Sequence, residues 1–194
     1  MIKVTAKLKS VTPYSQSRHI EEPDIPKESA VARELRLWHK RMHVTKDGKV
    51  FIPMMQFTKA VLEAAVYLSL PVEGKKQKTL TKHFITSVRC VTDLVTKWSA
   101  KDIQPEELFV PSNGKRGGGS RVTKYFPLIP SWEGTITFIV ADETITQSAF
   151  EMVIRCAGAL IGIGRFRPKN EGSYGMFEVL EIKWHSGDHK LQLA

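Results

Sequence analysis

Alternating hydrophobic and polar residues define the first predicted element, a strand over residues 2–11 in which the alternation runs from residue 2 to residue 9. The even positions are apolar and the odd positions are lysine or threonine, which is the period-two pattern of a strand with one buried face. The polar face carries three lysines and is therefore cationic. Such a face contributes little to packing but suits phosphate groups. We predict a strand with one core face and one cationic face.

Two longer segments have the 3.6-residue spacing of helices that bury one side. The first begins at Pro53, which suits the first helical position, and continues to residue 70. Its expected inward residues are Met54, Phe57, Val61, Ala64, Ala65 and Leu68. The second helix covers residues 146–162, and its expected inward residues are Phe150, Val153, Ile154, Ala157 and Ile161. We expect both helices to pack against one sheet.

Shorter elements are predicted between these segments. Ser29 can cap a helix whose inward residues would be Val31, Leu35, Trp38 and Met42. Strands are expected over residues 50–52, 83–91, 135–141 and 176–184. Residues 73–82 have the composition of a basic loop.

The order of these elements predicts an α+β fold. Two insertions, at about residues 12–52 and 92–134, interrupt the order strand, helix, strand, strand, helix, strand. This is the split βαβ order of ferredoxin-like folds, in which two helices cover a four-stranded antiparallel sheet. RNA-recognition modules share the order with many unrelated proteins, so it decides no function. We predict a single domain over residues 1–194.

The charge balance favours a polyanionic partner. The 194 residues carry a formal net charge of +9 with a pI near 9.6, while 42% hydrophobic and 25% charged residues are ordinary for a globular protein. A basic surface kept only for solubility is the alternative interpretation. Because the charges cluster along the chain, we favour a partner such as nucleic acid.

Cysteine use and hydropathy indicate a cytoplasmic protein. Cys90 and Cys156 are isolated in apolar stretches, which predicts buried reduced thiols rather than a disulfide framework or a metal site. The N-terminus lacks the apolar core of a signal peptide. The longest apolar run, residues 156–164, is too short to cross a bilayer. We expect no membrane partner.

A glycine- and arginine-rich loop is predicted after the second long helix. Residues 161–179 hold four glycines, including Gly162 and Gly164, around Arg165, Arg167 and Lys169. Glycine lets a backbone approach closely, and guanidinium groups bind phosphates through paired donors. A Rossmann loop follows a strand, whereas this loop follows a helix, and no G-K-[ST] sequence is present. We interpret the loop as a phosphodiester contact; a plain connection with solvated arginines is the alternative.

Two further basic clusters stand elsewhere in the chain. Residues 113–126 hold Lys115, Arg116, Arg121 and Lys124 around three consecutive glycines, followed by Tyr125 and Phe126. Flexibility, charge and aromatic rings together suit a clamp on a single strand, although a surface loop has the same composition. The other cluster consists of Lys75, Lys76, Lys78 and Lys82. It is compatible with direct contact or with a solvated face.

Three stretches together resemble the RAMP superfamily of CRISPR effector proteins, particularly the backbone subunit that polymerises along guide RNA. They are the glycine loop, residues 49–65, and residues 12–18 (TPYSQSR). In that family a G-x-G-R-type loop follows the second helix, an I-P-G-S-S-x-K-G segment opens the first, and a long insertion forms a thumb over the RNA. Ile52, Pro53 and Lys59 match, while Met54 and Met55 stand where the family has Gly and Ser. A stand-alone relative carried by a phage or mobile element would fit this pattern.

The resemblance adds residues to the expected site. In the family the turn after the first strand, which here ends in Arg18, approaches the nucleic acid beside the glycine loop. Lys59 matches the family's lysine on the first core helix. The expected nucleic-acid-binding residues are Arg18, Lys59, Lys115, Arg116, Arg121, Lys124, Gly162, Gly164, Arg165, Arg167 and Lys169.

The leading hypothesis is a non-catalytic protein that binds single-stranded RNA or DNA by its phosphates. It would need no cofactor or metal and would associate with itself along the strand, as the resembled subunits do, within a larger ribonucleoprotein or replication assembly. One alternative is a metal-dependent endoribonuclease, because some RAMP backbone subunits carry a cleaving aspartate in the first insertion, where Asp24 stands. Another is a decoy subunit that enters a CRISPR or replication assembly and blocks it.

Histidine spacing gives a weak signal for zinc. His39 and His43 are four residues apart but lack a third ligand and the glutamate of H-E-x-x-H, and His185 and His189 are weaker candidates. We expect solvated or partly packed histidines.

Overall fold

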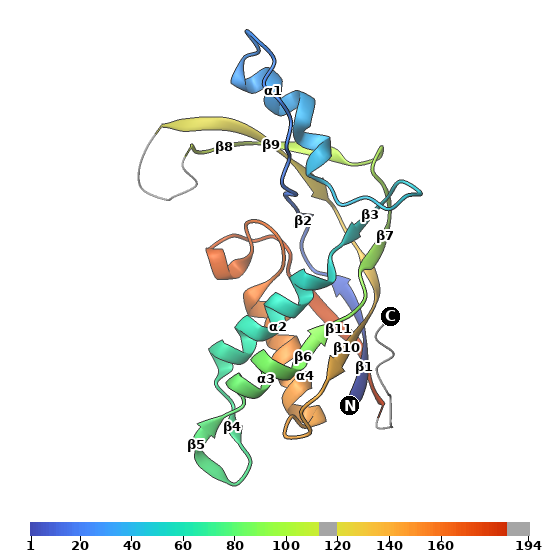
Figure 1. Ribbon diagram of the computed structural model, residues 1–194, viewed down its shortest axis with the longest axis vertical. Coiled ribbons are helices and arrows are strands. Elements are labelled where there is room, and N and C mark those ends of the chain that lie inside the picture. Colours follow the sequence, from blue (N-terminus) through green and yellow to red (C-terminus); the bar gives the residue numbers. More distant parts are fainter. Residues whose placement is uncertain (113–119, 186–194) are drawn as a thin grey trace.

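A four-stranded antiparallel sheet forms the core of the computed structural model, which describes residues 1–112 and 120–185. Its strands are β1 (Ile2–Ser10), β6 (Val88–Cys90), β10 (Glu133–Val140) and β11 (Phe177–His185), in the spatial order β11-β1-β10-β6. The helices α2 (Met54–Leu68) and α4 (Gln147–Cys156) pack together on one face of the sheet (Figure 1). The predicted α+β, ferredoxin-like fold is confirmed.

Strand β1 lies at the centre of the sheet because its alternating pattern suits two neighbours. Val4, Ala6 and Leu8 are fully buried, and the strand pairs with both β10 and β11. On the opposite face, the Lys7 and Lys9 ammonium groups form ion pairs with Glu133 and Glu178 of those neighbours, at 2.8 and 3.7 Å. Two of the lysines on the cationic face are thus already paired within the sheet.

The two long helices bury most of the residues that their spacing predicts. The exceptions are Met54, which is exposed, and Leu68, which is only partly buried. On α2, Phe57, Val61, Ala64 and Ala65 are buried, although Pro53 caps the helix instead of being its first residue. On α4, all five predicted inward residues are buried, and Thr146 caps the helix. A short π-helix, Ala157–Ile161, continues α4 and leads directly into the glycine loop.

Two predictions between α2 and β10 are wrong. Residues 83–91 are not one strand, because α3 (Thr81–Ser87) precedes the short β6. Leu80, which caps α3, and Phe84 within it are four residues apart and both buried, so packing at helical spacing overrides the β-branched composition. Residues 73–82 are not a plain loop, because β4 (Pro71–Val72) and β5 (Lys75–Thr79) form a hairpin there.

The first insertion holds β2 (Tyr14–Ser15), α1 (Ala30–Leu37), a 3-10 helix (Trp38–Arg41) and β3 (Lys49–Ile52). The predicted helix after Ser29 is present, with Ser29 as its cap. Its predicted inward face is wrong at Val31 and Leu35, which are exposed whereas Glu34 and Leu37 are buried. The other two predicted residues lie beyond the end of α1, where Met42 is buried and Trp38 packs against the core.

The second insertion holds β7 (Leu94–Ser99), β8 (Gln104–Pro111) and β9 (Arg121–Ile129). Strand β7 pairs with β3, and β2 pairs with β9, so the two insertions are joined to each other by hydrogen bonds. The β8–β9 hairpin and α1 lie at one end of the molecule, and the β4–β5 hairpin lies at the other (Figure 1). Lys115 and Arg116 lie outside the described residues.

Both cysteines are free thiols. Cys90 is buried, and this burial raises its pKa to about 11; Cys156 is only partly buried. Within residues 1–112 and 120–185, every helix is too short or too polar to cross a bilayer.

Candidate nucleic-acid interface

The glycine loop, residues 162–175, is held by two segments that are distant in sequence. The Arg165 amide donates to the Ser15 carbonyl at 2.9 Å, and the Gly175 amide donates to the Pro13 carbonyl at 2.7 Å. The Gly164 amide donates to the side-chain oxygen of Gln56, in the first turn of α2, at 3.2 Å. The loop, the turn after β1 and the start of α2 therefore meet at one place, as the resemblance implied.

The glycines of this loop have a reason within the fold. Gly164 has a φ of +75°, and a Cβ there would lie 2.4 Å from the Ser15 carbonyl oxygen. Gly175 has a φ of +71°, and its Cβ would lie 1.9 Å from the Ile163 carbonyl oxygen. The backbone that approaches these glycines is the protein's own, whereas we expected a phosphodiester. Gly162 is buried at the base of the loop.

Arg167 lies underneath the loop and not on its surface. Its side chain is 8% exposed and its guanidinium forms an ion pair with Glu63 of α2, with Nη1 and Nη2 at 2.8 and 3.0 Å from the two carboxylate oxygens. Lys169 also reaches Glu63, at 3.2 Å. Arg167 therefore ties the loop to α2, and the expectation that it contacts phosphate is replaced by this structural role. Lys169 is exposed and remains beside the loop.

Arg165 points the other way, toward the β8–β9 hairpin. Its guanidinium carbon lies 3.5 Å from the centre of the Phe126 ring and 5.0 Å from that of Phe166. Phe166 lies between the two arginines and has a φ of +50°, an uncommon backbone conformation. The side chains of Arg165 and Arg167 point in opposite directions on either side of it. Burial, followed by the charge of Arg41, lowers the pKa of Arg165 to about 10, so the group stays cationic at neutral pH.

A buried carboxylate organises the cations next to Arg165. Glu34 of α1 is only 4% exposed and accepts hydrogen bonds from Arg41 at 2.7 Å and from Lys124 of β9 at 2.5 Å. Burial by itself would raise the pKa of Glu34, but the hydrogen bond from Lys124 and the charge of Arg41 outweigh it and hold the pKa below its ordinary value. This cluster docks α1 on the hairpin.

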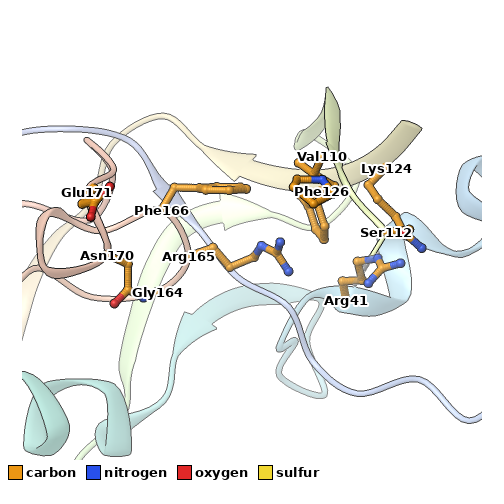
Figure 2. A pocket seen from close by; sticks show the side chains of 11 residues that line it. Arg41, Val110, Ser112, Lys124, Phe126, Gly164, Arg165, Phe166, Asn170 and Glu171 are labelled. Atoms are coloured by element: carbon orange, nitrogen blue, oxygen red, sulfur yellow. The ribbon is translucent and has the colours of Figure 1, made fainter. Parts of the chain in front are cut away.

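Two adjoining hollows run along these cations. The larger, of about 710 Å³, lies between the glycine loop and the hairpin and is lined by Arg41, Lys124, Arg165, Phe126 and Phe166, among others (Figure 2). The smaller, of about 340 Å³, shares Arg41 and Lys124 with it and is also lined by Arg18 and Arg33. We call the five cations Arg18, Arg33, Arg41, Lys124 and Arg165 the basic groove. The carboxylates of Glu34 and Glu171 line the same hollows, and Asp24 pairs with Arg33.

The structure gathers some predicted residues and separates others. Arg18, Lys124 and Arg165 come together in the basic groove. Lys59 is exposed on the face of α2 that also carries Gln56 and Glu63, both bonded to the glycine loop, so it lies next to that loop. Arg121 lies at the far end of β9, where it donates to the Phe109 carbonyl at 3.3 Å.

Sequence reasoning missed Arg33 and Arg41. Arg33 lies within α1 and Arg41 ends the 3-10 helix that follows it, and no local signal marks either as part of a site. Their role depends on contacts with β9 and with the turn after β1, such as the hydrogen bond from the Arg18 amide to the Arg41 carbonyl at 2.9 Å.

The candidate metal-binding residues lie apart. The Asp24 carboxylate is exposed and pairs with the Arg33 Nε at 2.9 Å. His39 belongs to the 3-10 helix, which ends at Arg41, so His43 does not share a helix face with it; His43 packs on Phe51 with ring centres 5.5 Å apart. His185 contacts the Thr5 hydroxyl at 3.3 Å, and His189 lies outside the described residues. No group of three or more His, Cys, Asp or Glu side chains in the described part could hold a metal ion.

No protein-family model matches the chain, and no curated protein matches it in sequence. Solved structures similar to it include a chain of the type III-B Cmr-beta bound to cognate target RNA, with a TM-score of 0.48 and 13% identity, covering 94% of this chain and 60% of that chain. Cmr6 from Pyrococcus furiosus gives a TM-score of 0.47 and 13% identity, covering 92% of this chain and 99% of that chain. A chain of a CRISPR RNA-guided surveillance complex gives 0.39 and 13%, covering 92% and 66%. Structures of CRISPR effector proteins, which the sequence resembles, are thus among those similar to this chain.

Proposed function

We propose that this protein binds single-stranded nucleic acid by its phosphate backbone in the basic groove. The observation that carries the proposal is the convergence of Arg18, Lys124 and Arg165 on adjoining open hollows, although more than 100 residues separate the first from the other two. Placing like charges together costs folding free energy, and the five cations of the groove outnumber the carboxylates of Glu34, Glu171 and Asp24 beside them, which favours an anionic ligand.

The groove provides donors suited to phosphate oxygens. Arg18 is exposed, and no ion pair engages it within the described residues. Arg165 is held over the Phe126 ring, and its side chain lines the larger hollow. A guanidinium fixed in this way loses little side-chain freedom when it binds a phosphate. Such contacts position a strand without reading its bases.

The proposal extends to assembly and chemistry. We propose that the protein does not cleave its ligand, and that copies associate side by side along the strand within a larger nucleoprotein assembly. The support for self-association is the sequence resemblance to backbone subunits of CRISPR effectors. The support for binding without cleavage is the position of Asp24, whose carboxylate pairs with Arg33 at the surface.

Fluorescence anisotropy with labelled oligouridine and oligothymidine tests the binding proposal. The double substitution R18A/R165A should weaken binding to both probes alike, by at least tenfold if each arginine contributes about 1 kcal/mol. A control of equal charge is K46A/K101A, which alters two exposed lysines in turns outside the groove and should change affinity little. Equal affinities of the two double variants, with both folded, contradict the proposal.

Incubation of labelled RNA with Mg²⁺ or Mn²⁺ tests the absence of cleavage. We expect intact RNA with the wild-type protein and with D24A. Metal-dependent cleavage that D24A abolishes would establish the endoribonuclease alternative instead.

A further inference from the structure

The β4–β5 hairpin carries a cluster of lysines that the basic groove does not include. Lys75 and Lys78 of β5 are exposed, and so is Lys82 in the first turn of α3. The hairpin protrudes at the end of the molecule opposite α1 and the β8–β9 hairpin (Figure 1). We call these three residues the lysine hairpin. Its position makes it a surface separate from the groove.

The lysine hairpin is anchored to the core. Val72 and Leu80 bracket β5 and are both buried in the main core. The Leu80 amide donates to the Leu70 carbonyl at 2.8 Å, and the Thr81 hydroxyl donates to the Ala65 carbonyl of α2 at 3.2 Å. The lysines therefore project from an ordered element, so an anionic ligand that binds them need not order the backbone first.

The charges of the lysine hairpin have no compensation within the described part of the chain. None of the three lysines forms an ion pair there, whereas Lys7, Lys9 and Lys124 all do. Residues 70–89 contain five lysines or arginines and one carboxylate, that of Glu73. Lys82 also stands at the positive end of a helix dipole, where a cation is unfavourable. This arrangement lowers stability, which favours a role in binding.

We propose that the lysine hairpin is a second binding site for the phosphate backbone of nucleic acid, distinct from the basic groove. A membrane surface is less suitable, because residues 73–79 offer no apolar side chain for insertion and the flanking Val72 and Leu80 are buried. Nucleic acid needs only closely spaced cations on an exposed element. With two sites at opposite ends, one molecule can hold two segments of nucleic acid.

Native mass spectrometry with oligouridine of about eight nucleotides tests the proposal, since single-strand sites cover about 4–16 nucleotides. Wild-type protein should bind two oligonucleotides, and K75A/K78A/K82A should bind one. The variant K75R/K78R/K82R keeps the charge and should restore two. A charge-matched control, K3A/K46A/K101A, removes three other exposed lysines and should also retain two.

The salt dependence provides a second readout. If each lysine neutralises one phosphate, the hairpin site contributes a slope of about −2 to log affinity against log salt, at about −0.7 per phosphate. Anionic phospholipid vesicles serve as the competing ligand. The proposal is overturned if K75A/K78A/K82A still binds two oligonucleotides. It is also overturned if this variant loses vesicle binding while it keeps both oligonucleotides.

The same experiment separates this site from the groove. The variant R18A/R165A should bind one oligonucleotide, at the hairpin. If wild-type protein binds only one, and only the hairpin variant loses it, the groove is refuted and the hairpin is supported. If only the groove variant loses it, the hairpin proposal is refuted and the groove stands. Unchanged thermal unfolding of each variant shows that the fold is intact.

Discussion

The ion pair beneath the glycine loop predicts an asymmetry between two substitutions. Arg167 is 7% exposed, and among residues 1–112 and 120–185 its guanidinium has one hydrogen-bond partner besides Glu63, the Gly162 carbonyl at 3.4 Å. Glu63, by contrast, also has Lys169 at 3.2 Å. E63Q therefore leaves a buried cation uncompensated, whereas R167M leaves a carboxylate that keeps one partner. Breaking a buried pair by removing one partner costs about 3–5 kcal/mol, and we expect about 3 kcal/mol for E63Q because its amide oxygen still accepts one hydrogen bond.

R167M should cost less, about 1 kcal/mol, because it retains the buried aliphatic stem and a well-packed apolar replacement is tolerated. The double variant E63Q/R167M should be more stable than E63Q alone. Urea unfolding measures the three free energies of unfolding, with unchanged m-values as evidence that the unfolded states are alike. In thermal unfolding a difference of 2 kcal/mol between the single variants corresponds to about 4–8 °C. Equal losses, or a larger loss in R167M, would refute the assignment of Glu63 as the anchor of the loop.

Two further predictions concern the surroundings of the groove. The pKa of Glu34 is lowered in the folded protein, so its carboxylate stabilises the fold above its ordinary pKa, and this contribution is lost as the pH falls through the folded pKa. In E34Q the urea midpoint should therefore depend less on pH between pH 7 and the acid range. A pH dependence equal to that of wild type contradicts the cluster. G164A should cost about 1–2 kcal/mol for its positive φ and about 1–3 kcal/mol more for overlap with the Ser15 carbonyl. Gly48 has a φ of +76° but open space around the position of a Cβ, so G48A should lose only the contribution of about 1–2 kcal/mol that comes from the positive φ. Equal losses of unfolding free energy in G164A and G48A contradict close packing of the loop.

Regular elements of the core could be predicted because their signals are local. Strand β1 and helices α2 and α4 each bury the face that their own spacing defines. Helix α3 could not be predicted, because its β-branched residues favour a strand, whereas burial of Phe84, four residues after the buried Leu80, is compatible with a helix. The buried face of α1 could not be predicted either, since Glu34 is held inward by Lys124, 90 residues away.

The candidate site was only partly visible in the sequence. Local composition identified Arg165 and Lys124, but it could not separate Arg165 from Arg167, which point in opposite directions around Phe166. Arg41 carries no local signal, because its place in the groove follows from its partner Glu34. Composition thus finds cationic segments, whereas the ion pairs between segments decide which cations remain available.

Salt dependence of oligouridine binding decides whether the groove arginines neutralise phosphates. Each neutralised phosphate contributes about −0.7 to the slope of log affinity against log salt, so R18A/R165A should give a slope less negative than wild type by about 1.4. The control K46A/K101A should keep the wild-type slope. A slope in R18A/R165A equal to that of wild type, with the fold intact, would show that the strand does not lie in the basic groove.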